Sequence, residues 1–189
     1  MHKDYIANYL TEVIEIADEI DIDSLSVLVS ELRNLQGRLF ILGVGGSAAN
    51  ASHAVNDFRK ILDIETYAPT DNVSELTARV NDESWDATMW KWLRTSKLTD
   101  KDALLIFSVG GGSENASLNL VEAMKWGKNK NCKIFSVVSR DGGAAKVFSD
   151  CCVLIPVVNN DRITPHAEEW QAIVWHMIVS CINDLKKNQ

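Results

Sequence analysis

The sequence predicts an α/β protein built on a doubly wound parallel sheet that is preceded by helices. Short, continuous apolar runs alternate with helical patterns along residues 38–185. These runs are not broken by polar residues, as expected for parallel strands covered on both faces. Glycine-bearing turns follow the first two runs. In such sheets ligands bind beyond the carboxyl ends of the strands, so these turns are where chemistry is expected.

The composition is that of one globular domain over residues 1–189. Of its 189 residues 46% are hydrophobic and 24% are charged, which provides enough apolar material for a single core. No apolar run reaches the ~20 residues that cross a bilayer, and residues 1–5 do not resemble a signal peptide. We therefore expect a cytoplasmic protein without a membrane partner. A formal charge of −7 and the lack of a dense basic cluster exclude nucleic acid as a partner. The four cysteines lack CxxC spacing, so no disulfide framework is expected.

Two helices are expected over residues 1–36, packed on the domain or between subunits. In the first, apolar residues recur at three- and four-residue steps from Ile6 to Ile20. The second begins near Ser24, a residue type that caps helices well, and ends at Gly37. Strands are then expected at 38–42, 103–107, 133–138 and 152–156, and helices at 47–62, 113–127, 143–148 and 167–185. This βαβα order defines the fold class.

Two strand-to-helix turns share a glycine–serine design. The first is Gly-Val-Gly-Gly-Ser-Ala-Ala at 43–49, and the second is Ser-Val-Gly-Gly-Gly-Ser at 108–113. Glycines let backbone N–H groups approach an anion, and a helix N-terminus attracts negative charge. One such turn alone is equally consistent with a plain connection, but two of them favour anion binding. The hydroxyls of Ser108 and Ser113 can donate to phosphate oxygens, and Ser113 can also cap the next helix.

The first turn also fits a dinucleotide-binding fingerprint, Gly43-x-Gly45-x-x-Ala48, with Asp63 or Glu65 as the acid for a ribose. This interpretation leaves the second glycine–serine turn unexplained. It also needs a strand where residues 63–66 form a poor one. A dehydrogenase is therefore the weaker alternative, because the motif alone is a weak signal.

Candidate chemistry lies on two helices. His53 and Asp57 stand four residues apart, so they share a helix face and can bind a metal or transfer protons; the alternative is an exposed pair without function. Glu168 and His176 are eight residues apart, ~12 Å along an ideal helix. One tetrahedral metal cannot take both from one straight helix. Either Glu168 precedes the regular helix or a second subunit supplies one of the two, and a core histidine is the alternative for His176.

These motifs, in their order and spacing, resemble the phosphoheptose isomerases (sedoheptulose 7-phosphate isomerases) of the sugar isomerase (SIS) fold. Gly45-Gly46-Ser47, followed by His53 and an acid at 57, resembles the family's first turn and helix. Residues 70–72 and 80–82 resemble its middle segment, and residues 139–143 match the SIS pattern. Residues 164–169, with His176 eight residues after Glu168, fall on the segment that ends the family's active site. The similarity runs from about Leu39 to His176.

The resemblance implies a flavodoxin-like three-layer sandwich and a homotetramer with active sites between subunits. It implies a ketose–aldose isomerisation of a phosphorylated sugar through an enediol, with sedoheptulose 7-phosphate and a manno-heptose 7-phosphate as the pair. Asp57 would be the base and His176 the acid. A zinc ion would be held by His53, Asp57, Glu168 and His176. Contacts to phosphate and sugar would come from Gly45, Gly46, Ser47, Asn81, Asp82, Ser108, Val109, Gly110, Ser113 and Glu168.

The chain departs from this family pattern in its site. Asp57 stands where the family has glutamate and Glu168 where it has glutamine, while glycines replace hydroxyl residues in the second loop. A carboxylate shortened by one methylene is displaced by ~1 Å or more, which is enough to affect catalysis. The alternative function is a non-catalytic SIS protein that binds a sugar phosphate or another protein. The acid at 57 and the histidine at 176 favour the enzyme.

Overall fold

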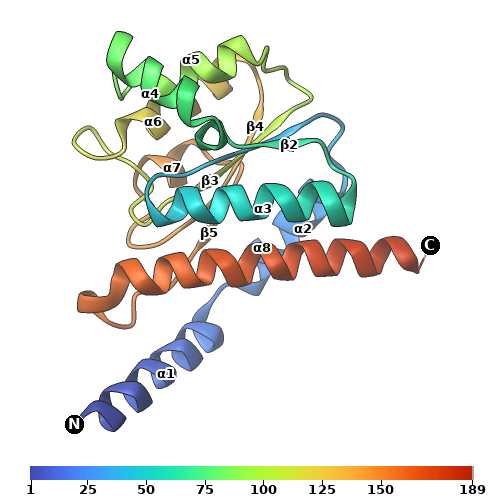
Figure 1. Cartoon of the computed structure of the whole chain (residues 1–189). Coiled ribbons are helices and arrows are strands. Elements are labelled where there is room, and N and C mark those ends of the chain that lie inside the picture. Colours follow the sequence, from blue (N-terminus) through green and yellow to red (C-terminus); the bar gives the residue numbers. More distant parts are fainter. Residues whose placement is uncertain (189) are drawn as a thin grey trace.

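A five-stranded parallel sheet forms the centre of the protein in a computed structural model that describes residues 1–188 (Figure 1). Its strands are β1 (Leu39–Leu42), β2 (Thr66–Tyr67), β3 (Ala103–Phe107), β4 (Lys133–Val138) and β5 (Cys151–Leu154). They are ordered β2-β1-β3-β4-β5, and every neighbouring pair is parallel. The chain winds one way from β1 to β2 and the other way from β3 to β5. This confirms the doubly wound sheet and puts its switch point between β1 and β3.

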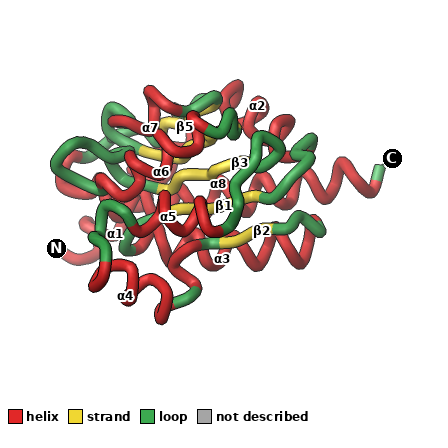
Figure 2. Tube along the Cα trace, turned by 90° about the horizontal axis from the view of Figure 1, so that it is seen from above, coloured by secondary structure: helices red, strands yellow, loops and turns green. Residues whose placement is uncertain are grey.

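Helices cover both faces of the sheet. Along β1, Leu39 and Ile41 face one layer, Phe40 and Leu42 face the other, and all four are fully buried. The first layer contains α2 (Ile22–Arg33), α3 (Gly46–Leu62) and α8 (Ile163–Lys187), and the second contains α5 (Thr88–Thr95), α6 (Leu118–Asn129) and α7 (Gly143–Phe148). Figure 2 shows the strands side by side, from β5 at one edge to β2 at the other. Burial on both faces explains the continuous apolar strand sequences.

The N-terminal segment forms two helices, as predicted. The first, α1 (His2–Glu19), extends away from the sheet beside the start of α8 (Figure 1). The start of α2 was predicted wrongly: the helix begins at Ile22 because Asp21, not Ser24, is its cap. The Asp21 carboxylate accepts hydrogen bonds from the backbone N–H groups of Asp23 and Ser24.

The segment between α3 and β3 holds structure that the sequence did not indicate. Residues 63–66 made a poor strand by pattern, but Thr66 begins the two-residue edge strand β2, which pairs with the start of β1. A 3₁₀ turn (Pro69–Asp71), α4 (Val73–Asp82) and α5 follow. Trp90 and Trp92 pack within the chain, against Trp126 and Phe40 respectively. These two side chains therefore do not form a free apolar surface.

The second glycine–serine loop is longer than predicted. Helix α6 begins at Leu118, and Ser113 does not cap it. The Ser113 N–H instead donates to the Ala116 carbonyl at 2.8 Å, and Ser117, the residue before the helix, has a left-handed φ of 52°. These local turns end the loop ten residues after β3 rather than five. The start of the C-terminal helix was instead predicted too late: α8 begins at Ile163, not at 167, and includes Glu168.

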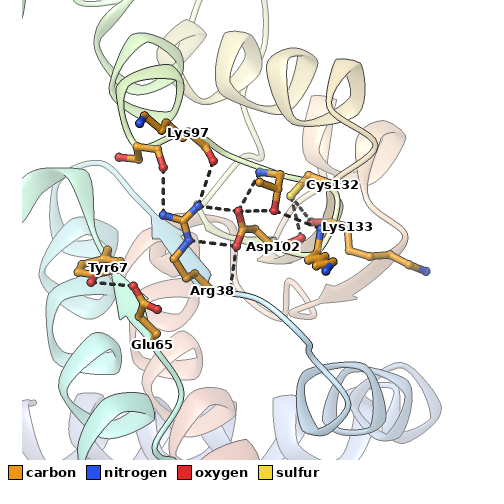
Figure 3. A network of polar contacts seen from close by, with 10 residues as sticks. Arg38, Glu65, Tyr67, Lys97, Asp102, Cys132 and Lys133 are labelled. Carbon is orange, nitrogen blue, oxygen red and sulfur yellow. Dashed lines mark hydrogen bonds and ion pairs between the residues drawn. The ribbon is translucent and has the colours of Figure 1, made fainter.

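The amino edge of the sheet is closed by a polar network (Figure 3). Arg38, just before β1, donates its guanidinium and its backbone N–H to Asp102, just before β3, at 2.8–3.1 Å. Burial opposes ionisation of Asp102, but the bonds from Arg38 outweigh it and hold the pKa of this carboxyl below its usual range. These groups tie β1 to β3. The carboxyl edge, where the glycine-bearing loops lie, is left for a ligand.

Among residues 1–188, no helix combines the length and apolar character needed to span a membrane. All four cysteines are free thiols.

Candidate functional site

Two neighbouring helices bring together three of the predicted metal ligands. His53 and Asp57 come from α3 and His176 comes from α8, which packs alongside α3 (Figure 1). Asp57 Oδ2 lies 3.4 Å from His176 Nε2 and 3.8 Å from His53 Nε2. Asp57 is 7% exposed, whereas both imidazoles are open to solvent. The cluster is therefore a fixed, buried carboxylate with two accessible nitrogen donors.

Hydrogen bonds fix how these groups point. His176 Nδ1 lies 2.9 Å from the Ala172 carbonyl oxygen, which can only accept, so this nitrogen carries the proton. In the neutral ring, Nε2 therefore keeps a free lone pair that can bind a metal, and it lies on the side of Asp57. The carboxylate is held from two sides: Asn56 Nδ2 donates to Oδ1 at 3.0 Å, and the Trp175 indole N–H donates to Oδ2 at 3.2 Å.

The cluster has the donor set of a cation site. Its three ligand atoms all lie within 4.8 Å of one another. Two imidazole nitrogens and one carboxylate oxygen, with an open fourth position, are typical of catalytic zinc centres. Ligand atoms around a tetrahedral zinc stand roughly 3.4 Å apart, from bond lengths of ~2.1 Å. The spacing between His176 and Asp57 already matches this value, so the donor set fits a metal.

Glu168 does not join this cluster. It lies within α8 and not before it, so the first of the two sequence-based explanations for the long Glu168–His176 spacing is wrong. Its carboxylate packs on Gly46, where an added Cβ would stand only 2.3 Å from Oε2. Asn50 also donates to the Glu168 backbone carbonyl at 2.8 Å. A carboxylate of the chain itself thus occupies the N-terminus of α3, a position that favours negative charge.

A cavity of about 650 Å³ opens at the second glycine–serine loop. Four residues predicted to contact the substrate line it: Ser108, Val109, Gly110 and Ser113. Arg140 and Asp141, from the turn after β4, and Thr164, from the first turn of α8, also line it. Arg140 is exposed and forms no hydrogen bond or ion pair within residues 1–188. Sequence reasoning missed this residue, although a cation directly after a strand of a parallel sheet was a usable signal.

Backbone contacts between two loops build the wall of the cavity. The N–H groups of Ala144 and Ala145, at the start of α7, donate to the carbonyls of Gly112 and Gly111 at 2.9 Å. A Cβ on Gly111 would lie 1.9 Å from the Gly142 carbonyl oxygen, so the loops approach this closely only with glycine there. The first amides of α7 are therefore already occupied, and Arg140 is the positive charge that faces the cavity.

The other predicted substrate contacts lie outside both places. Asn81 and Asp82 are exposed at the end of α4 and bond to each other at 2.7 Å. Gly45 is exposed with a left-handed φ of 64°, and Ser47 is buried in the first turn of α3. None of these four lines the cavity or belongs to the metal-binding cluster of this chain.

The fold and this arrangement match known proteins. A phosphoheptose isomerase from Helicobacter pylori (strain P12) is 28% identical over 189 residues, which cover 96% of this chain and 93% of that protein. A probable phosphoheptose isomerase from Thermoplasma volcanium is 30% identical over 158 residues, with coverage of 79% and 74%. The solved phosphoheptose isomerase from Neisseria gonorrhoeae superposes with a TM-score of 0.84 at 25% identity, over 97% of this chain and all of that one. No protein-family model matches the sequence. Relatives this similar over 74–93% of their length, together with the shared fold, show that the chain belongs to the phosphoheptose isomerase family.

Proposed function

We propose that the protein is a cytoplasmic aldose–ketose isomerase that interconverts sedoheptulose 7-phosphate and a manno-heptose 7-phosphate. The observation that carries this proposal is the buried Asp57 carboxylate, fixed by two hydrogen bonds beside two solvent-accessible imidazoles. Such an isomerisation requires a base to remove a proton from the carbon next to the carbonyl. It also requires an acid to return a proton to the neighbouring carbon.

In this proposal Asp57 is the base and His176 is the acid. The Asp57 carboxylate is buried and cannot swing into water, so it presents a fixed oxygen to the substrate C–H bond. The His176 ring is oriented through Nδ1 by the Ala172 carbonyl, so Nε2 faces the cluster: in the metal-free site this nitrogen would carry the proton for the substrate, and in the metal-bound site it would be a ligand instead. His53, Asp57 and His176 would hold a zinc ion, which when bound polarises the oxygens of the sugar.

The cavity at the second loop is the proposed phosphate site. Arg140 supplies a positive charge there, and Ser113 supplies a hydroxyl at its exposed mouth. A guanidinium recognises phosphate through two parallel hydrogen bonds, which offsets the hydroxyls that this loop lacks. The first glycine turn is a poorer phosphate site, because the Glu168 carboxylate already lies against Gly46.

The spacing of these parts supports an active site made by two chains in a homotetramer. Thr164 lines the cavity, and His176 stands twelve residues further along the same helix, ~18 Å away. Glu168 lies eight residues before His176 on this helix and packs on Gly46 rather than on the cluster. A second chain would therefore bring its Glu168, and the cavity at the start of its α8, towards the metal of the first. Apolar side chains available for self-association lie exposed on α1 and α8: Ile6, Leu10, Ile14, Ile173 and Met177.

Turnover of sedoheptulose 7-phosphate by Asp57 variants tests the proposal. Asp57→Asn keeps the size of the side chain but removes its basicity, so kcat should fall roughly 100-fold or more. Asp63→Asn, an exposed position at the end of the same helix, is the matched control and should leave kcat unchanged. Wild-type protein that binds the sugar phosphate without turning it over would instead favour a binding protein of this family.

A further inference from the structure

We infer that Trp175 is a positioning residue that sets the location of the Asp57 carboxylate, a role that rests on the proposed isomerase site. Trp175 is 2% exposed, and its indole N–H donates to Asp57 Oδ2 at 3.2 Å. Oδ2 is also the oxygen that faces both imidazoles. One indole nitrogen thus determines where the acceptor atom shared by the whole cluster lies.

The ring of Trp175 also contacts the other members of the cluster. Its centroid lies 4.6 Å from that of His176 and 5.3 Å from that of His53, where the two rings meet edge to face. The indole also stacks on Phe107, at the end of β3, with centroids 6.0 Å apart. The indole is therefore braced by the sheet and cannot follow Asp57 if the carboxylate shifts.

This bracing bears on the shortened side chain at position 57. An aspartate reaches less far from α3 than the glutamate typical of the family, so its oxygens need an external contact to hold them near α8. The Trp175 N–H lies on α8 and provides this contact, while Asn56 holds the other oxygen from α3. Both oxygens are fixed from two different helices, which preorganises the carboxylate for a ligand or a C–H bond.

A second buried tryptophan on α8 separates this role from plain packing. Trp170 is 6% exposed, but its indole nitrogen has no hydrogen-bond partner within residues 1–188. Exchanging either tryptophan for phenylalanine removes an indole from the same helix and the same core. Only the exchange at position 175 removes a hydrogen-bond donor that contacts Asp57. Trp170→Phe is therefore a control for volume and stability.

The test compares Trp175→Phe with Trp170→Phe in zinc affinity, measured by competition with a chromophoric chelator, and in steady-state kinetics. Loss of a residue that orients a metal ligand costs 10–100-fold in metal affinity or activity. We expect Trp175→Phe to weaken zinc binding about 10-fold or more and to lower kcat by a similar factor with KM within about twofold. Trp170→Phe should change neither. In an Asp57→Ala background, Trp175→Phe should have no further effect, because the hydrogen-bond acceptor is already removed.

Equal zinc affinities and equal kcat values for the two phenylalanine variants would overturn the inference. If Trp175→Phe does not fold, 3-(3-benzothienyl)alanine at position 175 keeps the shape of the indole without its N–H, and the same losses are expected. A wild-type protein that binds zinc but does not isomerise sugars would overturn the proposed function, while the zinc comparison would still decide the role of Trp175. A wild type that does neither would overturn both.

Discussion

The charged side chains of the site are held in two different ways. Asp57 is buried, and both of its oxygens accept hydrogen bonds. Arg140 stands in the left-handed region, with a φ of 56°, just after β4, and has no partner within residues 1–188. A fixed carboxylate suits proton transfer at a defined place, whereas an unpaired guanidinium suits capture of a charged ligand. The two functions thus separate at the level of single residues.

The role of Arg140 can be measured by ligand binding. Among residues 1–188, Arg140 is the only cationic side chain that lines the cavity at the second glycine–serine loop. Replacing it with Gln should therefore raise the Kd for inorganic phosphate and for the sugar phosphate about 10-fold. Arg94→Gln, an exposed arginine packed on Trp90 in α5, is the matched control. Isothermal titration calorimetry gives both constants. Unchanged phosphate affinity in Arg140→Gln would move the phosphate site elsewhere.

At the scale of elements, α1 depends on a polar anchor at the start of α8. Glu12, on α1, accepts hydrogen bonds from Arg162 and from Asn159, and its Oε2 lies 2.8 Å from His166 Nε2. The Tyr9 hydroxyl donates to the carboxylate of Glu169, which lies one turn after His166 on α8. Burial, together with this carboxylate, raises the pKa of Tyr9 to about 12. The outer face of α1 remains apolar and exposed. The anchor therefore sets the direction in which α1 leaves the domain.

This anchor should depend on pH in a defined direction. Hydrogen bonds from Arg162, and then contact with His166, hold the pKa of Glu12 far below its ordinary value of about 4.5. A carboxyl whose folded pKa is depressed stabilises the fold fully above its unfolded pKa. This contribution shrinks as the pH falls below that value and is gone only below the folded pKa. Glu12→Gln should thus lower the melting temperature at pH 7, and its difference from wild type should narrow steadily as the pH falls below about 4.5.

The matched control for the anchor is Glu15→Gln, an exposed acid on the same helix. Thermal unfolding followed by circular dichroism at several pH values measures both variants against wild type. A gap between Glu12→Gln and wild type that stays constant down to the lowest pH would contradict the anchor's dependence on an ionised Glu12.

At the scale of the whole molecule, a single chain contains all parts of the proposed site but does not bring them together. The His53–Asp57–His176 cluster is complete within one chain, while Glu168 packs on the first glycine turn and the cavity opens at the start of α8. Glu168 and His176 are eight residues apart on the continuous helix α8, so these two side chains cannot meet at one metal within one chain. A symmetric assembly that places the α8 helices of two chains side by side would bring Glu168 of one chain to the metal-binding cluster of the other.

Mixed tetramers test this assembly directly. Asp57→Ala and Glu168→Ala proteins should each be nearly inactive, but unfolding and refolding them together should restore activity in about a quarter of the sites, since each half must come from the right parent. Mixing Asp57→Ala with His176→Ala should restore nothing, because these two residues act within one chain's cluster. Sedimentation as a monomer, or full activity of Glu168→Ala alone, would refute the two-chain site.

Much of the sheet could be predicted from sequence because its signals are local. The strands at 103–107 and 133–138 and the helix at 143–148 were predicted to the residue, since buried parallel strands are continuous apolar runs bounded by polar or glycine residues. His53 and Asp57 meet because four residues make one helical turn. The edge strand β2 escaped prediction because two residues carry no period, and their strand conformation depends on pairing with β1.

What only the tertiary structure decided are contacts between segments far apart in the chain. The glycine loop before α6 takes its place because amides of α7, more than thirty residues further on, donate to its carbonyls. Glu168 leaves the predicted metal site because α8 is continuous through it, and its carboxylate packs on Gly46. Arg140 faces the cavity, and Trp175 reaches Asp57, only once β4 and α8 are packed in place. Sequence patterns report each segment's own backbone preferences, whereas these positions result from packing between segments, which no local pattern encodes.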